Sequence, residues 1–166
     1  TRVERPSLSE WLTGVGRIFL GVGLVWGVCR VVPEGWEVLR GWTGMVGLLQ
    51  ILHFGLFAVL SCWWRSMGVD APPLMRQPIR SESLSEFWGR RWNRAFRDLT
   101  HQFLFRPLSK RLGGTAGMWC GFVVSGLIHE AVISIPAGGG YGGPTAFFTM
   151  QACGLACERS RIGKQW

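Results

Sequence analysis

Long uncharged stretches, separated by short charged ones, dominate the chain and predict helices that cross a membrane. Residues 41–64 form a run of 24 residues without a formal charge, and about 20 such residues are enough to span a bilayer. Residues 11–32 predict a weaker span, because the uncharged run within it is only 12 residues long and an arginine at each end would have to snorkel to the interface. An interfacial helix is the alternative for this second stretch.

Two further apolar stretches follow in the C-terminal half. Residues 114–135 predict a third span, and after the glycine-rich turn 136–144 a shorter helix runs over 145–157. The pattern therefore predicts an all-α, polytopic membrane helix bundle with about four spans. We expect residues 1–166 to form a single membrane domain and to be a fragment of a longer protein.

Between the second and third predicted spans lies a segment with a different pattern. Ser83 and Glu86 have the spacing of a capping box, which predicts a helix that begins there and is stopped by Pro107. Aromatic and apolar residues recur on one face of this helix, and basic residues recur on another: Trp88, Trp92, Phe96, Leu99 and Phe103, against Arg90, Arg94, Arg97 and His101. An interfacial helix that lies on anionic lipid explains both faces, but it does not explain Asn93.

The charge of the chain changes this picture in one respect. The net charge is +8, and residues 65–111 hold ten Lys or Arg against four Asp or Glu. Such a patch can bind the phosphate of a lipid, a cofactor or a nucleic acid. Because the patch lies beside membrane spans, we expect membrane lipid or a phosphorylated cofactor as its partner and no nucleic acid. Since the connections 33–40 and 136–144 have little positive charge, the positive-inside rule predicts that 65–111 is cytoplasmic.

The third predicted span contains two adjacent ionisable residues, His129 and Glu130. Ionisable groups inside a span are costly, so they indicate function. Ser125 lies one turn before His129 on the same helix face, and an imidazole can take a proton from a hydroxyl group near neutral pH. The alternative is structural, with both residues hydrogen-bonded to other helices. For His53, in the stretch 41–64, we favour the structural interpretation, and no metal site is expected because His and Cys never reach ligand spacing.

Two of these segments resemble a known family. The sequence EFWGRRWNRAFRDL (86–99) resembles the Phe-Trp-x-x-Trp-Asn motif of the membrane-bound O-acyltransferases, in their wax-synthase-like branch. The sequence VSGLIHE (124–130) resembles the histidine segment of that family. The resemblance covers roughly residues 68–160, so the chain is expected to be part of a longer acyltransferase.

The resemblance implies a multi-helix membrane fold with a tunnel, and acyl transfer from acyl-coenzyme A to an alcohol. It implies that His129 and Asn93 are catalytic, with His129 as the general base, and that acyl-coenzyme A is a co-substrate with no bound cofactor. The candidate substrate-binding residues are Phe87, Trp88, Trp92, Arg90, Arg94, Arg97, Ser125 and Glu130.

Three functions remain open at this point. The leading hypothesis is an acyltransferase, similar to wax ester synthases, that acts on a long-chain or other lipid-like alcohol. The second is an acetyl-coenzyme A-dependent O-acetyltransferase of a small hydroxylated metabolite. The third belongs to another class, a non-catalytic membrane protein whose basic segment binds anionic lipid.

Overall fold

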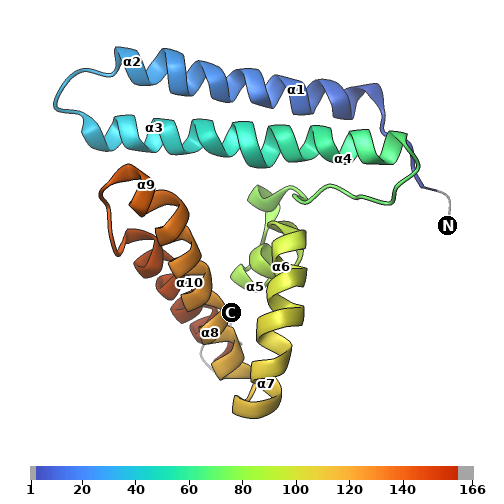
Figure 1. The fold of residues 1–166 in the computed structure, drawn as a ribbon, viewed down its shortest axis with the longest axis vertical. Helices are drawn as coiled ribbons and strands as arrows, with labels where there is room; N and C mark the ends of the chain where they lie inside the picture. Colours follow the sequence, from blue (N-terminus) through green and yellow to red (C-terminus); the bar gives the residue numbers. More distant parts are fainter. Residues whose placement is uncertain (1–2, 161–166) are drawn as a thin grey trace. The chain divides into compact units, whose positions relative to one another are not determined.

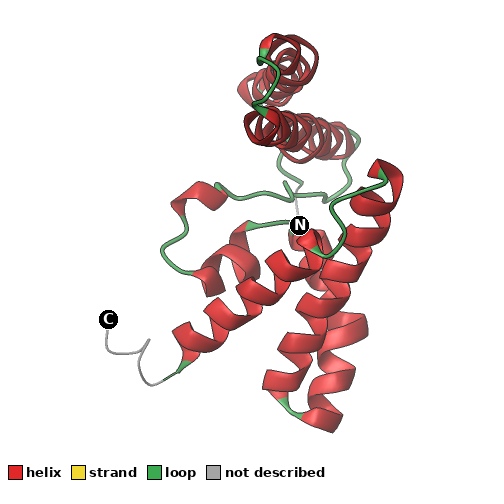
Figure 2. Ribbon diagram, turned by 90° about the vertical axis from the view of Figure 1, so that its left-hand side faces the viewer, coloured by secondary structure: helices red, strands yellow, loops and turns green. Residues whose placement is uncertain are grey.

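The computed structural model describes residues 3–160, and this part of the chain is helical with no strand (Figure 2). The all-α class expected from the sequence is therefore confirmed. The chain divides into two compact units, Thr1–Arg76 and Gln77–Trp166, and each is described by itself. The single membrane domain expected over 1–166 stays a prediction.

The first unit is a hairpin of two long helical arms (Figure 1). The first arm comprises α1 (Leu8–Val22), a π-helical stretch (Gly23–Val28) and α2 (Cys29–Val31). The second comprises α3 (Glu37–Leu49), a π-helical stretch (Gln50–Leu56) and α4 (Phe57–Ser66). The arms have 24 and 30 residues, and both are long and apolar enough to cross a membrane. They confirm the position of the first two predicted spans.

Small residues allow the two arms of the hairpin to approach closely. A Cβ atom added at Gly21 would lie 2.5 Å from the carbonyl oxygen of Gly47, and one at Gly55 would lie 2.5 Å from a side-chain carbon of Ile18. Close backbone approach at glycine is a common way for membrane helices to associate. The contact explains the need for glycine at these two positions.

The second unit contains the remaining helices. After a 3₁₀ turn (Pro78–Arg80) come α5 (Leu84–Glu86), a π-helical stretch (Phe87–Arg91), α6 (Arg94–Thr100), a π-helical stretch (His101–Phe105) and α7 (Arg106–Leu112). Then follow α8 (Gly114–His129), a π-helical stretch (Glu130–Ser134), α9 (Ile135–Ala137) and α10 (Gly143–Arg159). Helices α8 and α10 lie side by side, and α7 packs on the first turns of α8 (Figure 1).

Three described helices are long and apolar enough to cross a membrane, whereas about four spans were expected. The third is the continuous helix Gly114–Ala137, of 24 residues, in agreement with the span predicted over 114–135. The expected fourth, α10, has 17 residues. A 17-residue helix is about 26 Å long, which is short of the roughly 30 Å of a hydrocarbon core.

The single amphipathic helix predicted over 83–107 is wrong in its course. Its first half ends at Arg91, Trp92 is extended (φ −94°, ψ 132°), and Asn93 adopts the left-handed conformation (φ 30°, ψ 68°). A second helix then runs through Pro107 to Leu112. The π-helical turn before Pro107 widens the helix where the proline ring would otherwise meet the carbonyl group one turn back, so the proline does not stop the helix.

Candidate functional site

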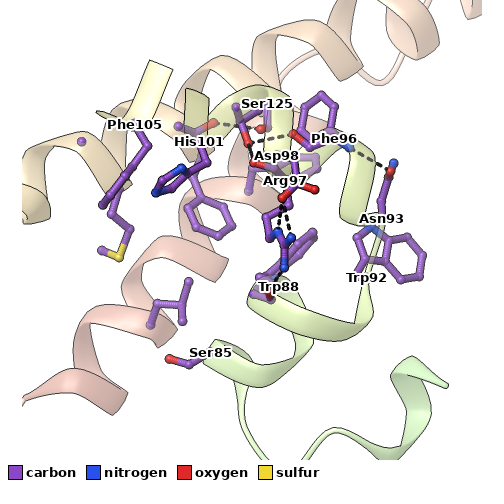
Figure 3. Close-up of a pocket in the computed structure, with 18 of the residues that line it drawn as sticks. Ser85, Trp88, Trp92, Asn93, Phe96, Arg97, Asp98, His101, Phe105 and Ser125 are labelled. Atoms are coloured by element: carbon purple, nitrogen blue, oxygen red, sulfur yellow. Dashed lines mark hydrogen bonds and ion pairs between the residues drawn. The ribbon is translucent and has the colours of Figure 1, made fainter. Parts of the chain in front are cut away.

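A cavity of about 600 Å³ lies in the second unit (Figure 3). It lies among α8, α10 and the motif helix, the segment 84–112 that is broken at Trp92 and Asn93. Its volume is within the range of about 300–1,000 Å³ that is common for small-molecule sites. Aromatic side chains form much of its wall, namely Trp88, Trp92, Phe96, Phe105, Phe122 and Phe148. Its polar lining includes Asn93, Arg97, Asp98, Thr100, His101, Ser125 and Arg159.

Asn93 holds the break between the two halves of the motif helix. Its side-chain oxygen accepts a hydrogen bond of 3.2 Å from the backbone N–H of Phe96, which caps the N-terminus of α6. Asparagine also tolerates left-handed φ angles better than most residues. Arg97 spans the break, because its guanidinium donates to the carbonyl oxygen of Gly89 and also pairs with Asp98. The turn is thus fixed from both sides.

The start of the motif helix is held by its own polar groups. The Ser83 hydroxyl accepts a hydrogen bond from the Glu86 N–H, as predicted, but the Glu86 carboxylate accepts from the N–H of Glu82 at 2.9 Å. Arg91 pairs with the same carboxylate at 2.7 Å. The Glu82 N–H, and then Arg91, hold the pKa of Glu86 below its ordinary value.

The motif aromatics form a continuous stack that leads into the cavity. Trp92 stacks on Phe87, with ring centroids 5.3 Å apart and planes 18° apart. Trp88 meets Phe122 of α8 at 5.5 Å, edge to face, and Phe148 of α10 at 5.7 Å. Such contacts between rings add stability beyond the burial of their surface. The stack therefore ties the motif segment to both long helices of this unit.

His129 lies at the end of α8, directly behind the wall of the cavity. Its Nδ1 atom is 2.7 Å from the carbonyl oxygen of Ser125, and its ring centroid is 4.5 Å from that of Phe148. Ser125 and Phe148 both line the cavity, whereas His129 does not. Since a carbonyl group can only accept a hydrogen bond, Nδ1 is the protonated nitrogen, and the neutral ring has its lone pair on Nε2.

Glu130 faces a different neighbour. One oxygen of its carboxylate accepts hydrogen bonds from the backbone N–H of Thr145, at 3.2 Å, and from the Thr145 hydroxyl, at 3.0 Å. The contact joins the end of α8 to the first turns of α10. His129 and Glu130 thus contact different residues, as is usual for neighbours on a helix, which point in different directions.

The structure brings some of the predicted site residues to one cavity and not others. Asn93, Trp88, Trp92, Arg97 and Ser125 line it, while His129, Phe87, Arg90, Arg94 and Glu130 do not. Arg90 is exposed, and so are Leu99 and Phe103 of the predicted aromatic face. The break at Asn93 explains why Leu99 and Phe103 are exposed, since residues after the break no longer share a helical face with those before it. The Ser125 hydroxyl donates to the carbonyl oxygen of Gly121, so Ser125 contacts His129 through its backbone alone.

Sequence reasoning missed the part that α10 has in the site, including that of several polar residues. The indole N–H of Trp88 donates to the side-chain oxygen of Gln151 at 3.2 Å. The Glu158 carboxylate accepts from the backbone N–H and the hydroxyl of Ser85, at 3.0 and 3.2 Å, and Arg159 lines the cavity. A local signal for Gln151 was its amide side chain within a largely apolar run. Among the described residues, no three His, Cys, Asp or Glu side chains are grouped to hold a metal ion.

Comparison with known proteins supports the resemblance. Residues 71–150 match the model of the membrane bound O-acyl transferase family. A long-chain-alcohol O-fatty-acyltransferase of Simmondsia chinensis is 38% identical over 73 residues, which are 39% of this chain and 21% of the relative. The probable long-chain-alcohol O-fatty-acyltransferase 9 of Arabidopsis thaliana is 33% identical over 92 residues, 51% of this chain and 26% of the relative.

The probable long-chain-alcohol O-fatty-acyltransferase 8 of the same plant is 34% identical over 93 residues, again 51% of this chain and 26% of the relative. These matches thus span about a fifth to a quarter of the length of the curated relatives. No solved structure matches the chain. Over residues 71–150, just under half of its length, the chain is thus similar to the membrane-bound O-acyltransferase family, and the relatives named above place the similarity in a wax-synthase-like branch.

Proposed function

We propose that the complete protein transfers an acyl group from acyl-coenzyme A to the hydroxyl group of a long-chain or other lipid-like alcohol. The similarity to long-chain-alcohol O-fatty-acyltransferases supports the substrate class. The hydrogen bond between His129 Nδ1 and the carbonyl oxygen of Ser125 is the observation that carries the mechanism. It supports a histidine whose other nitrogen is ready to accept a proton.

In this mechanism His129 is the general base. Its Nε2 atom takes the proton of the alcohol while the hydroxyl oxygen attacks the carbonyl carbon of the thioester. A new C–O bond forms, the C–S bond breaks, and the departing thiolate of coenzyme A takes the proton back from the imidazolium. The Ser125 carbonyl group keeps the proton on Nδ1 and stabilises the imidazolium during the reaction, much as an oriented partner does for other functional histidines.

The aromatic cavity supplies the second requirement, a site with little water. A thioester is already activated, so exclusion of water protects it from hydrolysis. We propose that the reacting groups meet at the part of the wall formed by Ser125 and Phe148, because both residues line the cavity and both contact His129.

The roles of the remaining motif residues follow from their contacts. We propose that Asn93 and Arg97 act by positioning the motif segment, since Asn93 caps α6 and Arg97 spans the break. Trp88 and Trp92 contact substrate in the cavity. Arg90 is exposed outside the cavity, where it attracts the phosphates of coenzyme A. The basic segment 65–111 is then on the cytoplasmic side, from which the acyl donor enters.

The test is a screen of the complete protein in membranes with radiolabelled acyl-coenzyme A donors and a panel of alcohols. We expect labelled ester with long-chain donors and long-chain alcohols. Product only from acetyl-coenzyme A and small hydroxylated acceptors would favour the acetyltransferase instead. Absence of ester with every pair, in a preparation that is inserted and folded, would overturn the proposal.

A further inference from the structure

We propose that Gln151 determines which substrates the cavity accepts, by fixing the orientation of the Trp88 indole ring. The inference rests on the proposed function, since selectivity is measured as transfer to different alcohols. Gln151 lies on α10, just beyond the segment that matches the family, and it does not itself line the cavity. It is a positioning residue that acts through Trp88.

The first step of the argument is the contact itself. The indole N–H of Trp88 donates to the side-chain oxygen of Gln151 at 3.2 Å, and both residues are half-buried. Phe148, Gln151 and Leu155 follow one another at steps of three and four residues, so they share one face of α10. Phe148 and Leu155 line the cavity, and Gln151 lies between them, where it holds the tryptophan that forms the adjoining wall.

The second step is the effect of losing this bond. Without Gln151 the half-buried indole N–H loses its acceptor, and an unpaired donor is unfavourable, so the ring would turn to find another partner. Its present orientation is edge-on to Phe122, with planes 89° apart, and tilted by 47° to Phe148. Any rotation of the indole therefore moves the wall of the cavity.

The third step connects this wall to the proposed base. Phe148 contacts both Trp88, at 5.7 Å, and His129, at 4.5 Å between ring centroids. A change in the Trp88 orientation alters the width of the cavity at the ring that contacts His129. Because Glu158 of the same helix holds Ser85, one turn before Trp88, the backbone of this segment stays in place and the rotation is confined to the side chain.

The experiment uses Gln151→Leu and Gln151→Glu in the complete protein, each also combined with Trp88→Phe. The readout is the ratio of kcat/KM for a straight-chain alcohol to that for a branched alcohol of equal carbon number. Loss of a bond of about 1 kcal/mol that holds the wall predicts a change of about fivefold in this ratio for Gln151→Leu. Gln151→Glu keeps an acceptor and retains the wild-type ratio. In the Trp88→Phe background, Gln151→Leu has no further effect, because no indole N–H remains.

Two controls separate this inference from its alternatives. Met150→Leu, at an exposed neighbouring position of α10, leaves the ratio unchanged. Wild type, Gln151→Leu, Trp88→Phe and the double variant Gln151→Leu/Trp88→Phe give a double-mutant cycle in thermal unfolding, which measures the Trp88–Gln151 coupling without any activity. An equal loss of kcat/KM for both alcohols, or a full effect of Gln151→Leu in the Trp88→Phe background, overturns the inference alone. Wild-type protein that forms no ester overturns the proposed function as well.

Discussion

Asn93→Ala tests the account of the break between the two halves of the motif helix. The alanine removes the acceptor that caps α6, which destabilises a helix by about 1 kcal/mol. It also forces a residue with a Cβ atom and no compensating polar group to adopt φ 30°, at a further cost of about 1–2 kcal/mol. The expected loss of local stability is therefore about 2–3 kcal/mol. Asn93→Gly removes the bond but tolerates the φ angle, so its loss is a few tenths of a kcal/mol.

The assay is hydrogen exchange of the peptides that cover α6, measured by mass spectrometry on the complete protein in detergent. If local opening limits exchange, a loss of about 2–3 kcal/mol speeds it by about 30- to 150-fold in Asn93→Ala. Asn93→Asp, which keeps a capping oxygen, exchanges at close to the wild-type rate. Exchange in Asn93→Ala that matches wild type would refute the capping account, and equal acceleration in the alanine and glycine variants would refute the argument from φ.

Further predictions concern the packing and ion pairs of both units. In Gly126→Val, the new side chain meets the backbone of α10, since a Cβ atom there would lie 2.8 Å from the Cα of Thr145. We expect a loss of about 1–3 kcal/mol in unfolding free energy. An unchanged melting temperature would contradict this expectation. Glu10→Gln removes the charge that pairs at 2.9 Å with Arg65, which is only 8% exposed. Thermal unfolding should therefore show a loss of about 2 kcal/mol in unfolding free energy, and equal melting temperatures would contradict a stabilising ion pair. Because the pKa of Glu86 is lowered, its contribution to stability is complete above the ordinary carboxyl pKa and is lost as the pH falls through the lowered value. Between pH 7 and pH 3 the melting temperature should therefore decrease more steeply for wild type than for Glu86→Gln. Parallel decreases in the two proteins would contradict this.

The sequence predicts the long helices well because burial in lipid requires long uncharged runs. The run 41–64 lies wholly within the arm α3–α4, and the span predicted over 114–135 differs from the structure by two residues at one end. The cap at Ser7 is also a local feature, because its hydroxyl and the Glu10 side chain satisfy each other's backbone N–H groups. These features depend on neighbours in the sequence, so they can be inferred without a structure.

The break at Asn93 could not be read from the periodicity of the segment. The four-residue spacing of Trp88, Trp92 and Phe96 is equally compatible with an unbroken helix, and the turn depends on a left-handed φ angle at one residue. The bond between Trp88 and Gln151 joins residues 63 positions apart, and nothing local encodes it. The break is a local conformation that the periodicity does not encode, whereas the Trp88–Gln151 bond is a tertiary contact.

The central claim is that Nε2 of His129 is the general base, and His129→Asn tests it most directly. The asparagine amide can replace Nδ1 as the donor to the Ser125 carbonyl group but has no counterpart of Nε2. The measurement is ester formation by the complete protein, wild type against His129→Asn, at equal membrane insertion and melting temperature. We predict a loss of at least about 100-fold in kcat for the variant, the lower end of the contribution of a general base. A folded His129→Asn protein that forms ester at the wild-type rate would contradict the claim.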